Sequence, residues 1–350
     1  MTADKVGIAM SGGVDSTVAA ILLKEQGYEV HGFFMELPLP DRELQIQRVR
    51  ETAKTLAIPL RIVDMQQQFS ATIINDFVAT YIRGYTPNPC VVCNASIKFG
   101  ALLTYMLEQG MEKMATGHYA RIERNDKGGY RLLRAMDPKK DQSYFLCRLG
   151  QQQLARILFP LASWRKSDIV ARAAAMGLGD YAGTESQDVC FLATGLKQFL
   201  TEHGVEEKSG DIITNDGRIL GRHSGISHFT VGQRRGLGLP DATPWYVIGL
   251  DRKHNRIIVG KNEDLFQGRV LIRDLHWLDG EPTLPWRGLV QLRSRHQPST
   301  ARLERKNKNT WEIIFAEPQR AITPGQFAVL YEQDRVAGSG IIMTRESCPP

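Results

Sequence analysis

The feature that most constrains this chain is a glycine-rich turn near its start, Ser11-Gly12-Gly13-Val14-Asp15-Ser16. The segment before it, 6–10, is short and apolar, as in a buried parallel strand, and residues 16–26 carry apolar side chains at helical spacing. A glycine turn between a strand and a helix aims backbone N–H groups and the helix dipole at one point, where an anion binds. We therefore predict a phosphate site here. The alternative is an ordinary connection that uses glycine for positive φ and Asp or Ser as a cap.

Two common nucleotide-binding loops are excluded by what this turn lacks. No Gly-Lys-Ser/Thr triplet follows Gly13, as a Walker loop requires, and residues 19–23 hold no third glycine, as the dinucleotide fingerprint requires. The turn instead resembles the PP-loop of ATP pyrophosphatases, which hold ATP and cleave between its α- and β-phosphates. This resemblance implies adenylation of an acceptor oxygen followed by attack of a nucleophile. Asp15 is the candidate ligand for the accompanying Mg²⁺.

Length and composition indicate a globular, soluble protein of two or three domains. The chain has 350 residues, of which 42% are hydrophobic and 23% charged. We see no leader and no apolar run as long as a membrane span, so we expect a cytoplasmic protein without membrane association. A monomer is also expected. Five cysteines are too few for a disulfide scaffold, which directs attention to metal or catalytic thiols. The net charge of +6 suits a polyanionic partner without identifying one.

The order of the expected elements indicates a doubly wound α/β domain. Strands are expected at 29–35 and 59–63 and a helix at 41–56, and this alternation is typical of a parallel sheet. Ligands bind such sheets outside the carboxyl ends of the strands, where the glycine turn and Met35 fall. Met35 is a candidate contact for an adenine ring, the alternative being a core residue. A strand leading to Gly117 is a second candidate wall of the nucleotide site.

From about residue 209 the pattern changes to short strands and glycine turns. We predict a PP-loop domain (adenine nucleotide alpha hydrolase-like) at 1–205, a small central β-rich domain at 206–268 and a C-terminal β-barrel at 269–347. A β-hairpin is expected around 126–129. The central strands are expected at 211–214, 229–232, 246–251 and 256–259, and the barrel strands near Val270, Leu289, Glu312, Phe327 and Gly340.

Prolines interrupt the alternation before the first two cysteines. Pro87 and Pro89 are expected to exclude helix and to hold an extended loop that carries Cys90 and Cys93, with the next helix at 99–109. Polar loops with lysines nearby would favour the thiolate form.

Several motifs then occur in one order along the chain. They are the turn at 11–16, Thr86-Pro87-Asn88-Pro89 with Cys93-Asn94, Ala115-Thr116-Gly117-His118-Tyr119, Lys140-Asp141-Gln142-Ser143-Tyr144, Glu185-Ser186-Gln187-Asp188-Val189-Cys190-Phe191, and Thr230-Val231-Gly232-Gln233-Arg234-Arg235-Gly236. Together they resemble one family, the tRNA-specific 2-thiouridylases, which replace the C2 oxygen of the wobble uridine with sulfur. No motif beyond the PP-loop would suffice alone.

The resemblance implies a persulfide mechanism. In the family the cysteine matching Cys190 carries the sulfur, and the one matching Cys93 completes the transfer, leaving a Cys93–Cys190 disulfide that a reductant reopens. The C2 carbonyl is a poor electrophile with a poor leaving group, and adenylation by ATP converts its oxygen into a phosphate leaving group. The implied products are 2-thiouridine, AMP and pyrophosphate, and an upstream sulfur-donor protein is implied as a partner beside tRNA.

Binding residues are carried over from the same motifs. The residues that resemble the family's ATP contacts are Ala9, Met10, Ser11, Gly12, Gly13, Val14, Asp15, Ser16, Met35 and Gly117. Those that resemble its tRNA contacts are Asn88, Pro89 and Cys90 at the target base, Lys140, Asp141 and Gln142 along the backbone, and Arg293, Ser294 and Arg295 in the last domain.

The basic character of the last domain supports tRNA binding. Residues 269–308 hold nine Lys and Arg against four Asp and Glu, as a surface that follows phosphates would. For its last four basic residues a solvated hairpin is the alternative; these are Arg302, Arg305, Lys306 and Lys308.

At Cys90 the chain departs from the family, which commonly has an Asp there as a candidate general acid or base. Two interpretations stay open for Cys90, Cys93 and Cys190. Cys90 is a spare thiol beside a persulfide route, or all three hold a [4Fe–4S] cluster with one open iron. A structural zinc would lack its fourth ligand. Cys147 is expected in the core, and Cys348 in the tail.

Two other functions fit parts of the sequence. Another PP-loop tRNA-modifying ligase would need no cysteine pair. A tRNA-binding module whose ATP site only regulates binding would release no pyrophosphate when tRNA is added.

Overall fold

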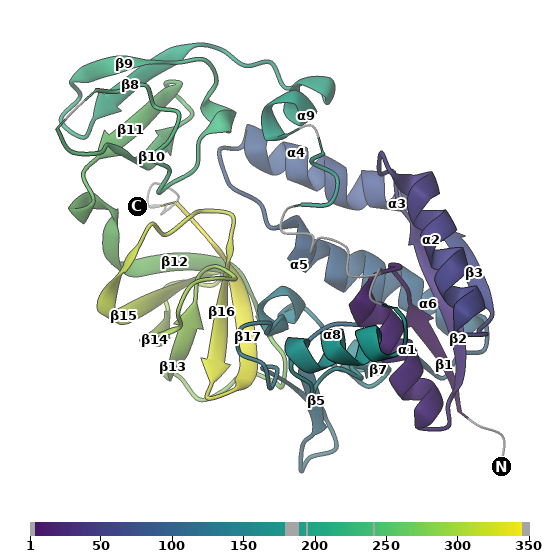
Figure 1. Ribbon diagram of the computed structural model, residues 1–350. Coiled ribbons are helices and arrows are strands. Elements are labelled where there is room, and N and C mark those ends of the chain that lie inside the picture. Colours follow the sequence, from purple (N-terminus) through teal and green to yellow (C-terminus); the bar gives the residue numbers. More distant parts are fainter. Residues whose placement is uncertain (1–3, 179–188, 194, 241, 345–350) are drawn as a thin grey trace.

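The computed structural model describes residues 4–178, 189–193, 195–240 and 242–344, which build three sheets (Figure 1). The first sheet is parallel, with strand order β3-β2-β1-β4-β7, and confirms the predicted doubly wound domain. Its strands are β1 (Lys5–Ala9), β2 (Glu29–Glu36), β3 (Leu60–Asp64), β4 (Lys113–Ala115) and β7 (Ile157–Leu158).

Helices cover both faces of this sheet. Alternate residues of a strand point to opposite faces, so the strands present apolar side chains on both faces for helices to cover. Phe33 of β2 packs into one buried cluster and Phe34 into the other. One face is covered by α1 (Val14–Glu25), α2 (Arg42–Thr55) and α8 (Lys166–Ala175). The other is covered by α3 (Gln66–Phe69), η1 (Ser70–Ile74), α4 (Asn75–Ile82), α5 (Pro89–Cys93), η2 (Asn94–Leu102) and α6 (Leu103–Glu108). Shorter helices are η3 (Ser143–Leu146), α7 (Gln151–Leu154) and α9 (Leu196–Glu202).

The prediction of an extended loop that carries Cys90 and Cys93 is wrong. Pro89 is the first residue of α5. Proline is tolerated at this position because the backbone N–H that it lacks would have no partner within the helix. Asn88 caps this helix, with its side-chain oxygen accepting from the N–H of Val91. Cys90 and Cys93 therefore lie on a helix, which runs on to Glu108.

That helix, Pro89–Glu108, is the one helix in the described part of the chain whose length and apolar composition would suffice to cross a membrane. Such a helix is weak evidence for a span, because core helices of soluble proteins meet the same two conditions. Here Ile97, Phe99, Leu102 and Met106 are fully buried against the sheet.

The central domain is a four-stranded sheet of order β10-β11-β8-β9. It is built from β8 (Gly210–Thr214), β9 (Ile219–His223), β10 (Tyr246–Asp251) and β11 (Arg256–Gly260). The prediction of a strand at 229–232 is wrong. Gly232 there has φ +92, outside the range of a strand, and the segment only follows β10 through hydrogen bonds of Gly232 and Gln233 with Val247.

The last domain is the predicted β-barrel. Its six strands have the order β12-β15-β14-β13-β16-β17, and pairing of β12 with β17 closes the circle. They are β12 (Phe266–Trp277), β13 (Trp286–Gln291), β14 (Ser299–Arg305), β15 (Thr310–Arg320), β16 (Phe327–Glu332) and β17 (Arg335–Ile342). β14 was not predicted, because its charged outer residues obscure the buried Ala301 and Leu303.

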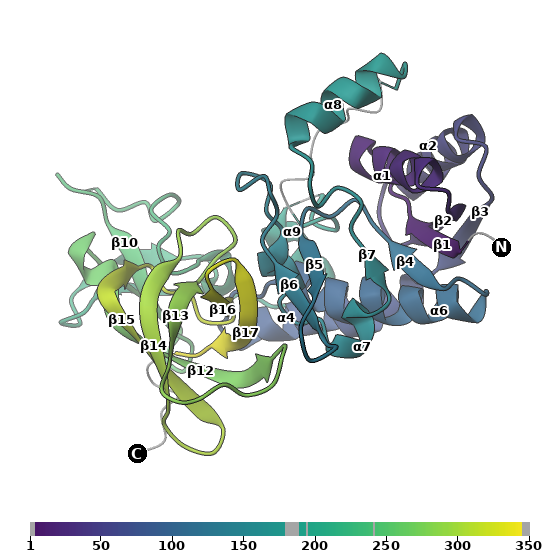
Figure 2. The ribbon, with the colours of Figure 1, turned by 90° about the horizontal axis from the view of Figure 1, so that it is seen from below.

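A hairpin of the first domain joins the barrel. β5 (Arg121–Arg124) and β6 (Tyr130–Leu133) form the expected hairpin, and β6 pairs with β17 at Leu133 opposite Arg335. Figure 2 shows β5 and β6 beside β16 and β17. The domain limits at 205 and 268 stay a prediction.

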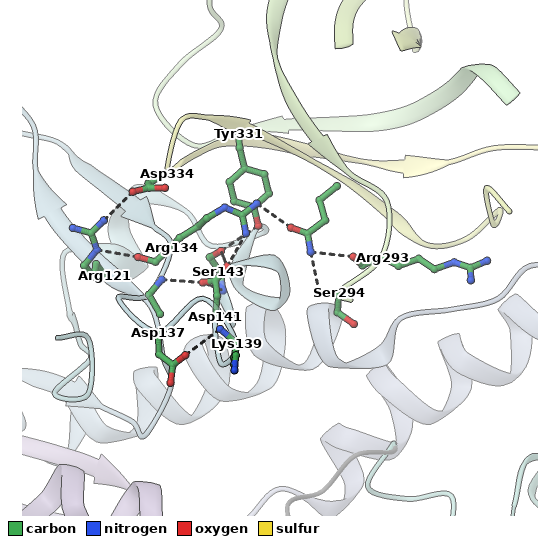
Figure 3. Close-up of polar contacts among 12 residues, drawn as sticks. Arg121, Arg134, Asp137, Lys139, Asp141, Ser143, Arg293, Ser294, Tyr331 and Asp334 are labelled. Atoms are coloured by element: carbon green, nitrogen blue, oxygen red, sulfur yellow. Dashed lines mark hydrogen bonds and ion pairs between the residues drawn. The ribbon is translucent and has the colours of Figure 1, made fainter. Parts of the chain in front are cut away.

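Arg134, just after this hairpin, is the charged centre of the interface (Figure 3). Its guanidinium donates to the carboxylate of Asp141 at 2.9 Å and to Gln291 at 3.0 Å, and it lies 3.7 Å from the ring centroid of Tyr331. Asp141 accepts further hydrogen bonds from Ala135 N–H and Ser143. The buried carboxylate of Asp141 and the guanidinium of Arg134 therefore neutralise each other at the place where the first domain meets the barrel.

Replacing Asp141 should destabilise this interface. In Asp141→Ala, Arg134 stays largely buried without its carboxylate, which costs about 3 kcal/mol of unfolding free energy. Glu123→Ala removes an exposed partner of Arg121 and should cost less than about 1 kcal/mol. Urea unfolding followed by tryptophan fluorescence compares the two variants. Equal midpoints would contradict this role of Asp141.

Candidate active site

The glycine turn joins the carboxyl end of β1 to the N-terminus of α1. Gly12 has φ +73, which favours glycine, and Gly13 is the N-cap of the helix. The hydroxyl of Ser16 donates to the Gly13 carbonyl oxygen at 3.0 Å and accepts from the Ser11 N–H at 3.2 Å. The turn is thereby closed, and the first N–H groups of α1, which have no partner within the helix, are available to an anion.

The strand β4 brings Gly117 directly onto this turn. A Cβ atom at Gly117 would lie 2.8 Å from the backbone of both Asp15 and Ser16, so any side chain would displace the turn. Met35 is half-buried near the end of β2, on the other side of β1. The ends of β2, β1 and β4 therefore converge, as predicted, at one edge of the sheet.

Asp15 has partners that the sequence did not reveal. The ammonium of Lys166 lies 2.7 Å from both of its carboxylate oxygens, and the hydroxyl of Tyr119 donates to Oδ1 at 2.7 Å. Tyr119 falls in one of the motifs. Lys166 comes from α8, 151 positions away, and no spacing rule connects it with the turn.

The structure brings Cys93 and Cys190, the predicted pair, into one region with Cys90, the candidate spare thiol or cluster ligand. Cys190 lies within electrostatic range of both Cys93 and Cys90, and all three feel the charge of Lys98. The four cysteines in the described part of the chain are free thiols. Phe191 anchors the segment of Cys190, because its buried ring packs against three other aromatic rings, those of Phe69, Phe77 and Phe199.

Burial dominates the chemistry of these thiols. Cys93 is half-buried, whereas Cys90 and Cys190 are exposed. Desolvation by the surrounding protein atoms nevertheless raises the pKa of Cys90, that of Cys93 to about 11 and that of Cys190 to about 12. Repulsion from Cys93 and Cys90 also raises the pKa of Cys190, whereas Lys98 lowers the pKa of all three. The polar setting expected to favour thiolates is thus outweighed, and the thiols are protonated at neutral pH.

His118 belongs to the same motif as Gly117, after the carboxyl end of β4. It follows Gly117, its Nδ1 is 2.8 Å from the hydroxyl of Thr116, and its ring packs on Phe99 and Phe159. Burial, with a smaller contribution from Lys98, holds the pKa of His118 well below its usual value. The imidazole is therefore neutral.

The loop before Cys90 is held by the barrel. The amide of Gln326 donates to the carbonyl oxygens of Thr86 and Pro87, both at 2.9 Å, and its oxygen lies 3.3 Å from the side-chain nitrogen of Asn88. Pro89 is buried. The sequence did not suggest Gln326, because it is more than 200 positions from this loop.

The segment expected along the tRNA backbone has mainly internal contacts. Asp141 is bound to Arg134 and Ser143, and the side-chain oxygen of Gln142 accepts from the Tyr119 N–H at 2.9 Å. Lys140 is half-buried beside them. In this structure Asp141 and Gln142 orient the segment.

The three barrel residues expected at tRNA differ in exposure. Arg293 is half-buried, and its guanidinium donates to the carbonyl oxygens of Val231 and Ala321 and to the Thr323 hydroxyl. Burial lowers its pKa. Ser294 and Arg295 are exposed. Arg293 therefore joins the central domain to the barrel, and Arg295 faces solvent.

A metal ion or an iron–sulfur cluster needs several donor atoms around one point. Among the described residues, no group of three or more His, Cys, Asp or Glu is arranged to hold a metal ion. The carboxylate of Asp15 is a suitable oxygen donor for Mg²⁺ beside a phosphate. The three thiols are near each other without forming a ligand set. Glu185, Ser186, Gln187, Asp188 and Cys348 lie outside the described residues.

This fold and site define a class. A parallel sheet whose first strand leads into a closed glycine turn without a Walker lysine is a nucleotide-binding domain of the PP-loop type. Residues 4–194 match the tRNA methyl transferase HUP domain, 197–261 the tRNA methyl transferase PRC-barrel domain and 267–342 the aminomethyltransferase beta-barrel domain.

Relatives that match over nearly their whole length identify the family within this class. A tRNA-specific 2-thiouridylase MnmA of Desulfotalea psychrophila is 49% identical over 342 residues, covering 96% of this chain and 98% of the relative. The proteins of the same name from Syntrophomonas wolfei and Solibacter usitatus are 43% and 41% identical and cover 97% and 98% of this chain, and 99% and 100% of the relatives. The chain belongs to the tRNA-specific 2-thiouridylase family, as its motifs predicted.

The raised thiol pKa values predict slow alkylation. At pH 8 the thiolate fraction of Cys93 should be about a hundredfold below that of an ordinary thiol, and the rate should keep rising beyond pH 10. Lys98→Met removes a charge that lowers the pKa, so it should slow alkylation further, whereas Lys98→Arg should not. Mass spectrometry of iodoacetamide-treated protein measures each cysteine. A plateau below pH 9 would contradict the burial argument.

Proposed function

We propose that this protein is an ATP-dependent tRNA-uridine 2-sulfurtransferase that acts on the wobble uridine. One observation carries the proposal: Cys190 and Cys93, far apart in sequence, come within electrostatic range of each other in a domain whose glycine turn suits the phosphates of ATP. Gly117 packs on the turn, and the next residue, His118, feels the charge of Lys98, as the three cysteines do. Family membership supports the same reaction.

The first step activates the base. The O2 oxygen of the uridine attacks the α-phosphorus of ATP, and pyrophosphate leaves, held by the N–H groups at the start of α1. Asp15 would hold the Mg²⁺ that accompanies ATP and that neutralises phosphate charge. The adenylated oxygen is now a phosphate leaving group.

The second step transfers sulfur. A donor protein supplies a sulfane sulfur to Cys190, and the terminal sulfur of this persulfide attacks C2, so that the C2–O2 bond breaks and AMP leaves. Cys93 then attacks the Sγ atom of Cys190. The sulfur–sulfur bond to the transferred atom breaks, and its electron pair stays on the sulfur bonded to C2. A Cys93–Cys190 disulfide remains, which a thiol reductant reopens.

Product analysis tests the first step. Incubation of ATP, tRNA and sulfur donor should give AMP and pyrophosphate, and Asp15→Ala should abolish 2-thiouridine while tRNA binding persists. Mass spectrometry of tRNA nucleosides and chromatography of the nucleotides measure both. ADP and orthophosphate would sink this mechanism. Binding of tRNA without pyrophosphate release would support a mere binding module instead.

Iron content and a Cys90 variant separate the two sulfur routes. On the persulfide route, Cys90→Ser should keep at least part of the activity, because Cys93 and Cys190 carry the transfer, and protein purified without air should contain no stoichiometric iron. About four iron atoms per chain, lost with activity in Cys90→Ser, would favour the [4Fe–4S] cluster. Cys147→Ser, at a buried thiol outside the site, is the matched control.

The barrel is proposed to dock tRNA through phosphates, with Arg295 and Ser294 on the exposed edge. Arg295→Ala should weaken tRNA binding and lower the salt slope by about one. Arg293→Ala should instead lower the unfolding midpoint, because Arg293 joins Val231 to Ala321 across two domains. Filter binding at several salt concentrations measures the first effect. An unchanged slope in Arg295→Ala would refute this docking edge.

A further inference from the structure

Gln291, the last residue of β13, is a buried glutamine whose side-chain amide binds two parts of the molecule at once. Its oxygen accepts from the guanidinium of Arg134 at 3.0 Å, and its nitrogen donates to the carbonyl oxygens of Arg293 at 3.0 Å and Ser294 at 2.9 Å. Reversing the amide would set its oxygen against two carbonyl oxygens and its nitrogen against a cation. The partners therefore fix the orientation of this amide.

The two carbonyl groups belong to one tight turn that follows β13. The N–H of His296 donates to the Arg293 carbonyl oxygen at 3.0 Å, which closes a β-turn. Ser294 and Arg295 occupy its two central positions and are exposed. The Ser294 carbonyl belongs to the central peptide group of the turn, whose orientation distinguishes one turn type from another. By binding this carbonyl, Gln291 fixes the direction in which the Arg295 side chain leaves the backbone.

The other side of the amide is bound to the first domain. Arg134 also donates to Asp141 at 2.9 Å, and the Asp141 side chain is only 7% exposed. Asp141 belongs to the segment 140–142, which was expected along the tRNA backbone. Hydrogen bonds therefore run without a break from this segment through Arg134 and Gln291 to the turn of Ser294 (Figure 3).

We propose that Gln291 is a positioning residue for tRNA, which holds the turn of Ser294 and Arg295 in a fixed relation to the segment 140–142. The phosphates of a nucleic acid follow one another at regular spacing, so two protein segments contact one backbone together only if their own spacing is constant. A turn that is ordered before binding also avoids the loss of affinity that ordering a loop costs. This inference rests on the proposed docking of tRNA to the barrel.

The alternative is that Gln291 only joins the barrel to the first domain. A joining role would affect the stability of the fold, whereas a positioning role acts through the exposed Arg295. The barrel offers a matched control in Gln319, a second buried glutamine. Its amide donates to the Glu317 carbonyl oxygen and its oxygen is bonded to the Ser299 hydroxyl, so it makes no contact with the turn.

The experiment is filter binding of an unmodified tRNA transcript with a wobble uridine at several salt concentrations. Gln291→Met should weaken binding about fivefold and lower the salt slope by about one, because Arg295 is no longer held toward its phosphate. Gln319→Met should bind within about twofold of the unaltered protein with an unchanged slope. An unchanged affinity and slope in Gln291→Met would overturn the proposal.

A double variant shows whether Gln291 acts through Arg295. If it does, adding Gln291→Met to Arg295→Ala should weaken binding no further, because the side chain that the turn positions is already absent. If Gln291→Met weakens binding equally in both backgrounds, the glutamine acts on the fold as a whole and the proposal is overturned.

Gln291→Glu keeps the test decisive if Gln291→Met fails to fold. Its carboxylate still accepts from Arg134, so the contact with the first domain is retained, but it cannot donate to the two carbonyl groups of the turn. Its loss of affinity should also disappear in the Arg295→Ala background. A loss that persisted there would come from the added negative charge and would contradict the positioning role.

Failure of this inference differs from failure of the proposed docking. If Arg295→Ala itself leaves the affinity and the salt slope unchanged, the docking of tRNA to this edge of the barrel is wrong. If Arg295→Ala lowers both and Gln291→Met lowers neither, the docking stands and only the role of Gln291 is wrong.

Discussion

The loop that precedes the cysteine helix depends on hydrogen bonds from another domain. Its backbone runs through the junction of the three domains, where polar groups need partners. The Thr86 N–H donates to the Pro324 carbonyl oxygen at 2.9 Å, and Gln326 binds the carbonyl oxygens of Thr86 and Pro87. The Thr86 hydroxyl also lies 3.2 Å from that of Thr230 in the central domain. The start of α5, and with it Cys90 and Cys93, is therefore positioned by all three domains.

This arrangement joins the first domain and the barrel into one unit. A barrel that only carried tRNA could be tethered by a flexible linker. Here the barrel also extends the β5–β6 hairpin, surrounds Arg134 with Gln291 and Tyr331, and fixes the loop before Cys90. Any shift of the barrel against the first domain would move that loop, so tRNA bound to the barrel, as proposed above, would keep a fixed position relative to the thiols.

The sequence predicted those parts whose determinants are local. The strand, glycine turn and helix at the start, the parallel sheet and the closed barrel follow from periodicity and turn residues, and the motifs bring Cys93, Cys190, Gly117 and Asp15 to one domain. Local rules failed where a proline has two possible meanings: Pro89 begins a helix instead of excluding one. They could not find partners set by tertiary packing, such as Lys166 for Asp15 or Gln326 for Asn88. They also misjudged the thiols, because a polar sequence around a cysteine does not reveal how much protein surrounds its sulfur.

On the persulfide route proposed above, the raised pKa values of the thiols would keep the site unreactive until sulfur is delivered. A protonated thiol is a weak nucleophile and a slow target of oxidants, so Cys93 and Cys190 in the resting state are protected from premature disulfide formation. A persulfide ionises more readily than a thiol. On that route, desolvation that disfavours the thiolate of unloaded Cys190 would still leave a nucleophile once sulfur has arrived, and the positive charge of Lys98 favours the anion. The reactivity of Cys190 on this route would then depend on the delivered sulfur, because the surrounding protein disfavours the anion of the empty thiol more than that of the persulfide.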